Sequence, residues 1–455
     1  MTGHEPPWDH GEGEGPDPDG SDPEDLLASL LEQLGPMLSA MSGGAPVLGG
    51  SAGWDHARQA AGAIATDGAG EGNVDPIVRL HFEQLVRVAQ LQIARHAGPL
   101  LAHSVPEVGV RAVNRPEWAS NTVDSYRTLF ERLSGALATM MRAQLDELRE
   151  EDLDAPEIEE LQSFLPPGFD LGAMLAAASS MFGPTMLMTL AGSVVGQLGR
   201  RAFGSFDLPI PRPADELPMV VLTAVDGFGA DWSLPADDVR LYQCLHELAH
   251  HAVLSQPHVA ERLRSLLGAH ADAFEADPER LASSLDDIDP EDPEALGSFM
   301  QRMNDPEQML NVIRSDRQRE LLPQIATLVA CVEGFTEWLL DSIGAPLLSE
   351  HARVAEAFRR RRVEITAAGR FVERLFGLEL TQDTLDAGVG FISGIAARGG
   401  DAAVAKLWSD LESLPTPAEL AAPGLWMARV GLDADQVLPE LDGSFEVPDF
   451  PDLDK

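Results

Sequence analysis

The sequence is short of basic residues and has almost no cysteine. Lys and Arg number 32 against 74 Asp and Glu in 455 residues, which gives a formal net charge of -42 at pH 7. This excess argues against a nucleic-acid partner and against binding to an anionic membrane surface, because both are themselves negatively charged. The two cysteines, Cys244 and Cys331, imply no disulfide framework and lack zinc-finger spacing. No basic segment followed by an apolar stretch stands at the start of the sequence, so we expect no secretory signal and a cytoplasmic location.

Charged residues are also missing from Leu171 to Gly199, a stretch long enough to cross a bilayer. Gly183 and Pro184 divide it into two pieces that are each too short to span, and Ser, Thr and Gly dilute both pieces. We therefore predict a buried helical hairpin here and no membrane segment.

Helical spacing of apolar residues dominates the remaining sequence, so the expected fold class is mainly α. Clear examples are Pro76 to Arg95 and Pro116 to Arg149. The best strand candidate is Leu217 to Val225, which is rich in Val and Leu and ends at the turn signal Asp226-Gly227. An edge strand at this place could pair with an extended peptide.

Composition divides the chain into four parts. Two disordered acidic tails are expected at residues 1–24 and 433–455, where Gly, Pro, Asp and Glu dominate or acidic residues are punctuated by proline. Short helices and a Gly-rich linker are expected at 25–74, and a helical domain at 75–432.

The segment His246-Glu247-Leu248-Ala249-His250 carries the clearest chemistry. It lies in a predicted amphipathic helix from Pro235 to Ser255. Residues four apart share one helix face, so His246 and His250 can bind one metal ion. Glu247 is offset by about 100° and is placed to polarise a water in the metal's open position, as a zinc hydrolase requires. The alternative is that both histidines are buried without a metal.

A catalytic zinc needs a third protein ligand, and the best candidate is Glu333. It interrupts an otherwise apolar helical run, where a lone carboxylate is costly unless it is paired or bound to metal. Glu337 and Asp341 follow at steps of four on the same face, and either could hydrogen-bond a ligand histidine. The alternative is a solvated acidic stripe.

Several blocks of the chain, in this order, resemble the type 2 zincin-like metallopeptidases of actinobacteria, which are often labelled hydrolases or associated with deazaflavin cofactor biosynthesis. The blocks are Asn114 to Asn121, Val195 to Gly199, Phe206 to Pro211, His246 to His250, Glu333 to Phe335 and a C-terminal run that includes Gly377 to Leu380, Gly388 to Phe391 and Leu425 to Arg429.

The resemblance implies a mainly helical zincin-like domain with a small β element next to the metal-binding helix. It implies one Zn2+ held by His246, His250 and Glu333, with Glu247 as the catalytic base and a peptide or protein as substrate. The sequence departs from the family where Leu385 and Phe335 replace tyrosines, so a tyrosine that stabilises the oxyanion is scarce. His351 or an arginine of Arg359 to Arg362 could take that role. The predicted function is a zinc-dependent peptidase, and the alternative is an inactive metal-stabilised scaffold or binding module.

Overall fold

A computed structural model describes residues 51–103, 105, 108–136, 139, 187–274 and 315–432, all within the compact unit Gly49–Lys455. Both predicted tails, the predicted helix and linker up to residue 50, and the first part of the predicted hairpin lie outside the described residues.

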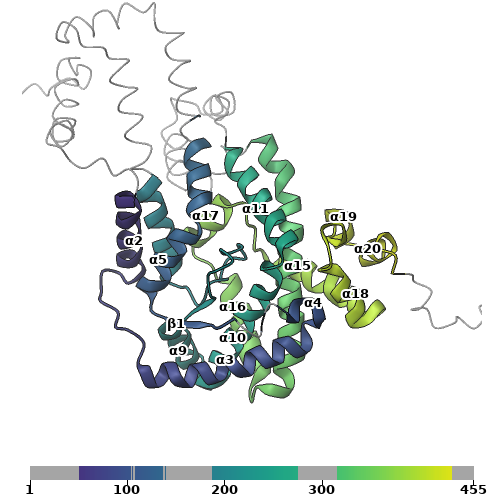
Figure 1. Ribbon diagram of the computed structural model, residues 1–455, viewed down its shortest axis with the longest axis horizontal. Helices are drawn as coiled ribbons and strands as arrows, with labels where there is room; N and C mark the ends of the chain where they lie inside the picture. The colour runs from purple at the N-terminus through teal and green to yellow at the C-terminus, as the bar shows by residue number, and fades with distance from the viewer. Residues whose placement is uncertain are drawn as a thin grey trace, which may run out of the picture. The chain divides into compact units, whose positions relative to one another are not determined.

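The described part is mainly helical, as expected, with two short strands (Figure 1). Helical turns also occur at residues 127–136 and 187–199. The named elements are α2 (Ser51–Ala65), α3 (Pro76–His96), α4 (Gly98–Ala102), β1 (Arg111–Val113), α5 (Arg115–Ser125), β2 (Met219–Val221), α9 (Leu222–Asp231), α10 (Ala236–Leu254), α11 (Pro257–Asp272), α15 (Asp316–Leu347), α16 (His351–Val363), α17 (Ala367–Leu375), α18 (Gln382–Leu407), the 3-10 turn η1 (Leu411–Ser413), α19 (Pro417–Leu420) and α20 (Pro423–Arg429).

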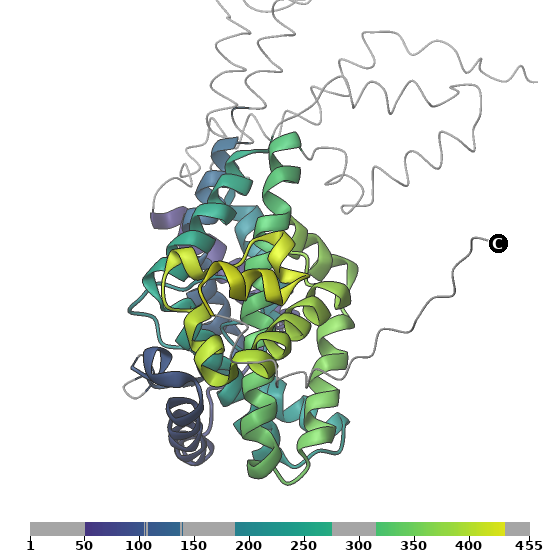
Figure 2. The same cartoon turned by 90° about the vertical axis from the view of Figure 1, so that its right-hand side faces the viewer.

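Helix α10 lies at the centre of the core and contacts α3, α9, α11, α15 and α16. Fourteen of its residues are buried. They include the predicted apolar face and also several polar side chains. The long helix α15 packs against α10 and, on another side, against α18. Figure 2 shows α18, α19 and α20 lying across α15. This arrangement leaves α15 between the central helix and the C-terminal helices.

The second part of the predicted hairpin is helical at residues 187–199 and faces the core with most of its apolar side chains. Its small residues allow close packing on α2, since a Cβ on Gly196 would lie 2.6 Å from the Ile64 Cβ. Within the described part of the chain, no helix has the length and apolar character that a bilayer span requires.

The predicted strand Leu217 to Val225 is mostly wrong. Only Met219–Val221 is extended, in parallel register with Arg111–Val113, and a helix begins at Leu222. The partner strand ends at Val113, and the next residue, Asn114, caps α5 with its side chain, so residues beyond Val221 have no ladder partner there. A helix satisfies their backbone groups instead.

The edge-strand prediction is also wrong for β2. Val220 pairs with Ala112 on one side and forms an antiparallel bridge with Gly204 on the other. The Ser205 N–H donates to the Met219 carbonyl at 3.1 Å, and the Val221 N–H donates to the Phe203 carbonyl at 2.8 Å. Both edges of β2 are therefore occupied by the chain itself.

Helix boundaries differ in one further place. The predicted helix from Pro116 to Arg149 breaks at Tyr126, which ends α5 with its N–H bonded to Thr122 and Asp124. Tyr126 is buried with its ring edge against Phe376, so the break turns an aromatic side chain into the core.

Candidate metal centre

Helix α10 holds His246, Glu247 and His250 in the predicted positions. Asp237 and Asp238 lie in its first turn, where negative charge is favourable next to the helix N-terminus. His246 and His250 stand one turn apart with ring centroids separated by 4.3 Å. The spacing of the two histidines therefore produces the shared face that the sequence predicted.

Glu333 of α15 joins the two histidines. One ligand atom from each of His246, His250 and Glu333 lies within 4.8 Å of the other two, and all three residues are buried. The His250 Nε2 lies 3.1 Å from the Glu333 Oε1. Two imidazoles and one carboxylate form a donor set that zinc accepts, with a fourth position left for water or substrate. The three residues therefore form a possible metal site.

The ring of His250 is fixed by its surroundings. Its Nδ1 lies 3.0 Å from the His246 carbonyl oxygen, which can only accept, so Nδ1 is the donor and Nε2 is the ring nitrogen directed at Glu333. The Phe206 ring stacks on the imidazole at 5.7 Å between centroids with 12° between the planes. The hydrogen bond and the stacking together fix the orientation of the His250 ring beside Glu333.

Close packing of α18 on α15 sets the place of Glu333. A Cβ on Gly388 would lie 1.9 Å from the Ala330 carbonyl oxygen, and one on Gly334 would lie 2.3 Å from the Gly388 carbonyl carbon. Only residues without a side chain allow this crossing. The two glycines therefore let α18 press on α15 in the turn that carries Glu333.

Glu247 is fully buried, and donors surround its carboxylate. The Oε2 accepts hydrogen bonds from the Ser205 N–H at 2.9 Å and the Phe206 N–H at 3.3 Å. The Oε1 accepts one from the Gln243 Nε2 at 2.8 Å and lies 3.4 Å from the His246 Nδ1. A carboxylate offers about four acceptor positions, and here each faces a nitrogen.

The backbone next to β2 is shaped around this carboxylate. A Cβ on Gly204 would lie 2.0 Å from the Glu247 Oε1, so no larger residue fits. The Gly204 carbonyl accepts a hydrogen bond from the Trp118 indole at 2.7 Å, which holds the segment in place. Sequence reasoning missed this segment as part of the site, although Phe206 was noted in a family block.

Burial dominates the protonation of the site. Burial, together with the nearby charges of His250 and Arg362, holds the pKa of His246 well below its usual value, so the imidazole is neutral. Burial raises the pKa of Glu247 well above its usual value, against the opposing effect of its backbone hydrogen bonds. Burial also acts to raise the pKa of Glu333, but His250 and Arg362 outweigh it and the net shift is downward. A neutral His246 and an ionised Glu333 are the forms of these two residues that bind a metal.

The other acids of the predicted stripe bind arginines. Glu337 accepts from the Arg359 Nε at 2.5 Å and lies 3.6 Å from Arg362, while the Asp341 Oδ2 lies 3.0 Å from Arg359. His351 lies 3.5 Å from Asp341 and packs on Gly344. The prediction that Glu337 or Asp341 supports a ligand histidine is wrong, because the His246 carbonyl takes that role for His250.

Arg362 is the arginine of the predicted cluster that reaches the metal site. Its Nη1 lies 3.3 Å from the Glu333 Oε2, and its side chain is mostly enclosed. Both tyrosines are buried. Tyr242 packs against Phe358 at 4.6 Å between ring centroids, and Tyr126 faces Arg212. Among the candidates for stabilising an oxyanion, Arg362 is therefore the one placed beside a ligand.

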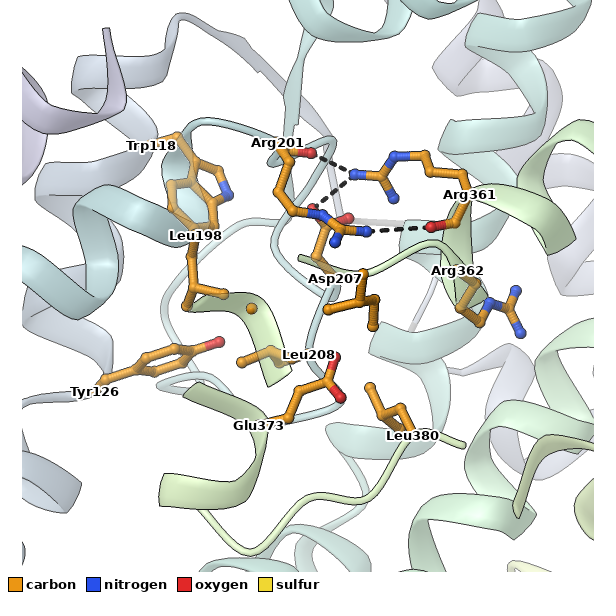
Figure 3. A pocket seen from close by; sticks show the side chains of 12 residues that line it. Trp118, Tyr126, Leu198, Arg201, Asp207, Leu208, Arg361, Arg362, Glu373 and Leu380 are labelled. Carbon is orange, nitrogen blue, oxygen red and sulfur yellow. Dashed lines mark hydrogen bonds and ion pairs between the residues drawn. The ribbon is translucent and has the colours of Figure 1, made fainter. Parts of the chain in front are cut away.

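A cavity of about 50 Å³ adjoins the site (Figure 3). Arg362, which pairs with Glu333, is part of its wall. So are Asp207 and Leu208, which directly follow the backbone that holds Glu247. The remaining lining residues are Trp118, Tyr126, Leu198, Arg201, Arg361, Ile365, Gly369, Glu373 and Leu380.

The chain is similar to one protein family and to a solved structure. A solved structure from Chloroflexus aurantiacus, described as a proposed hydrolase with a novel fold, is 20% identical, with a TM-score of 0.48 over 84% of this chain and 99% of that one. No curated protein matches the chain in sequence. The zincin-like metallopeptidase family matches residues 53–427, a range that contains both helices of the metal site. The chain therefore belongs to the zincin-like metallopeptidase family.

Proposed function

We propose that this protein is a zinc-dependent peptidase. The observation that carries the proposal is the convergence of His246, His250 and Glu333, whose ligand atoms come within 4.8 Å of one another from two helices. A buried cluster of two imidazoles and a carboxylate is costly to maintain without a cation, which supports a metal-binding role. Membership of a metallopeptidase family supports a peptide or protein substrate.

In this proposal each residue has a role that follows from its position. His246, His250 and Glu333 would hold one zinc ion, which polarises a substrate carbonyl and lowers the pKa of a water when bound. Glu247 is the proton acceptor, since burial raises the pKa of its carboxylate. Arg362, 3.3 Å from Glu333, is placed to stabilise negative charge on the carbonyl oxygen.

One observation favours a second candidate, a metal-stabilised scaffold without turnover. The Glu247 carboxylate has zero exposure and faces the Ser205 and Phe206 N–H groups, the Gln243 amide and the His246 ring. A base needs a free lone pair for the proton, whereas a carboxylate surrounded in this way is also suited to orienting His246.

The two candidates differ in the effect of Glu247→Gln. We expect the purified protein to contain about one zinc per chain and to cleave members of a peptide library in a chelator-sensitive way. Glu247→Gln should keep the zinc and lose cleavage by about 100-fold or more, as expected for a general base. Glu83→Gln, at an exposed position on α3, is the control.

Each result separates the candidates. Zinc with chelator-sensitive cleavage that Glu247→Gln abolishes supports the peptidase. Zinc without cleavage of any library member supports the scaffold. Protein that contains no zinc and takes none up contradicts both.

A further inference from the structure

The cavity next to the metal site has five charged groups in its wall. They are Arg201, Arg361, Arg362, Asp207 and Glu373. The rest of the wall is mostly apolar or aromatic, so a polar group that enters the cavity loses part of its hydration. Which of these charges are already paired decides what the cavity can bind.

Three of the five charges have partners. The Asp207 Oδ2 accepts from the Phe203 N–H at 2.8 Å and from the Arg361 guanidinium at 3.3 Å. The Arg361 guanidinium also donates to the Arg201 carbonyl. Arg362 is paired with Glu333, as described above, and with a second acid of α15. These groups are neutralised by the protein itself.

Glu373 is the first of the two that remain. It is 8% exposed, and in the described part of the chain no hydrogen bond or ion pair reaches its side-chain oxygens. Figure 3 shows its carboxylate directed into the cavity between Leu208 and Leu380. A mostly buried carboxylate without a hydrogen-bond partner is uncommon, because it loses much of its hydration and only the charges of nearby arginines such as Arg201 and Arg370 offset that loss.

Arg201 is the second. Its guanidinium donates to the Arg361 carbonyl at 3.1 Å, and no carboxylate among the described residues lies within ion-pair distance of it. In Figure 3 the Glu373 carboxylate points toward the side of the cavity where Arg201 and Asp207 lie. The two charges have opposite signs but form no ion pair with each other. The cavity therefore offers an unpaired acceptor and a donor with unused N–H groups.

We propose that this cavity is a substrate subsite that binds an amide unit, with the amide N–H donated to Glu373 and the amide carbonyl accepting from Arg201. A peptide unit carries one donor and one acceptor that point in opposite directions, which suits two groups on different parts of a wall. A cation would satisfy Glu373 but face Arg201, and an anion would satisfy Arg201 but face Glu373. A neutral amide satisfies both.

The size of the cavity agrees with one amide unit. A volume of about 50 Å³ holds roughly four waters, comparable to the heavy atoms of acetamide. The subsite rests on the proposed peptidase function for its meaning, because it lies beside the residues that would hold the zinc. It implies a substrate with at least one amide unit besides the one that is cleaved.

Small probes test this binding without any turnover. We would measure the binding of acetamide, acetate and ethylammonium to the purified protein at pH 8 by saturation-transfer difference NMR. Wild-type protein should bind acetamide, and Glu373→Gln and Arg201→Gln should each weaken that binding about 10-fold, as expected when a hydrogen bond to a charged group is lost. Glu83→Gln, on the exposed surface of α3, should bind acetamide like wild type.

A probe that binds in the cavity should bind less well to Glu373→Gln. A probe whose binding this variant leaves unchanged binds elsewhere, for example at a metal. The proposal is overturned if acetamide shows no binding that depends on Glu373, or if acetate or ethylammonium shows such binding at least as strongly. Circular dichroism of each variant verifies that it is folded. The experiment measures binding and needs no turnover. If the protein cleaves no peptide, the proposed peptidase function is contradicted, and the acetamide measurement still decides whether the cavity binds an amide.

Discussion

Glu373 should weaken the folded protein at neutral and alkaline pH. Burial, opposed by the charges of Arg201 and Arg370, raises the pKa of Glu373 to about 7 from an ordinary 4.5. At a pH above both values the folded state must hold an ionised carboxylate that the unfolded state holds more easily. The difference in pKa corresponds to roughly 3 kcal/mol of lost stability at pH 8.

The sign of this effect follows from the direction of the shift. A raised pKa means that folding favours the protonated form, so below about pH 4.5 the penalty is absent. It grows as the pH rises and is complete above about 7. By the same linkage it is about 1 kcal/mol at pH 5.5, where only the unfolded chain is ionised.

Glu373→Gln removes the ionisation and keeps the shape of the side chain. We expect the loss of ionisation to stabilise the protein by about 3 kcal/mol at pH 8 and by about 1 kcal/mol at pH 5.5. Burying the new amide has a cost that does not change with pH, so the same amount is subtracted from both gains. Urea unfolding followed by tryptophan fluorescence at the two pH values gives the free energies, and their difference cancels that constant. Glu83→Gln, on the exposed face of α3, should show no such dependence on pH.

A stability gain for Glu373→Gln that is equal at pH 5.5 and pH 8 would refute this reasoning. It would mean that the carboxylate is as well solvated in the cavity as in the unfolded chain. A loss at pH 8 would mean that Glu373 has a partner that stabilises its ionised form.

The remaining predictions concern packing and the metal. Gly388→Ala should destabilise the protein by about 1 to 3 kcal/mol in urea unfolding and lower its zinc content, because the new Cβ would lie 1.9 Å from the Ala330 carbonyl oxygen. The control is Gly390→Ala on the same helix, where a Cβ would have nothing within 4 Å, and this variant should be as stable as wild type or slightly more stable. Gly204→Ala should displace the Glu247 carboxylate and be destabilised by a similar amount, and equal stability to wild type would contradict the contact. Removing the metal with a chelator should lower the unfolding temperature in differential scanning calorimetry, since a ligand at 1,000 times its Kd stabilises by roughly 4 kcal/mol.

The sequence predicted the three candidate metal ligands from local spacing and from one carboxylate inside an apolar run. His246 and His250 are four residues apart on a helix, and that spacing alone puts them on one face. Glu333 was predictable because a carboxylate inside an apolar helical run needs a partner. Both inferences depend on the residues' own helices, which the structure confirms as α10 and α15.

The same helical reasoning was wrong about Glu337 and Asp341. They share a face with Glu333, but each step of four residues moves about 6 Å along the helix axis, so both are carried away from the two histidines. At those positions they meet Arg359, which approaches from α16. Residues on one helix face point in the same direction, but this does not predict how far each of them lies from the two histidines.

Gly204 and Glu373 could not be predicted as site residues, because their roles depend on packing between distant segments. Gly204 matters because its backbone touches a carboxylate on α10, far along the chain. In the sequence, Glu373 looks like any acidic residue of a short amphipathic helix, and only the packing of α17 beside the cavity shows its position in the wall. Neither has a signal in the spacing of its neighbours.

The contrast between Glu247 and Glu373 indicates where the substrate meets the protein. Both carboxylates are buried, and burial raises the pKa of each. Four nitrogens of the protein surround Glu247, so the fold itself stabilises that group. Glu373 has no such partner among the described residues, so its burial costs stability unless something else supplies a donor. A residue that lowers stability and faces a cavity beside a candidate metal site is most simply explained by a ligand that provides the missing hydrogen bond.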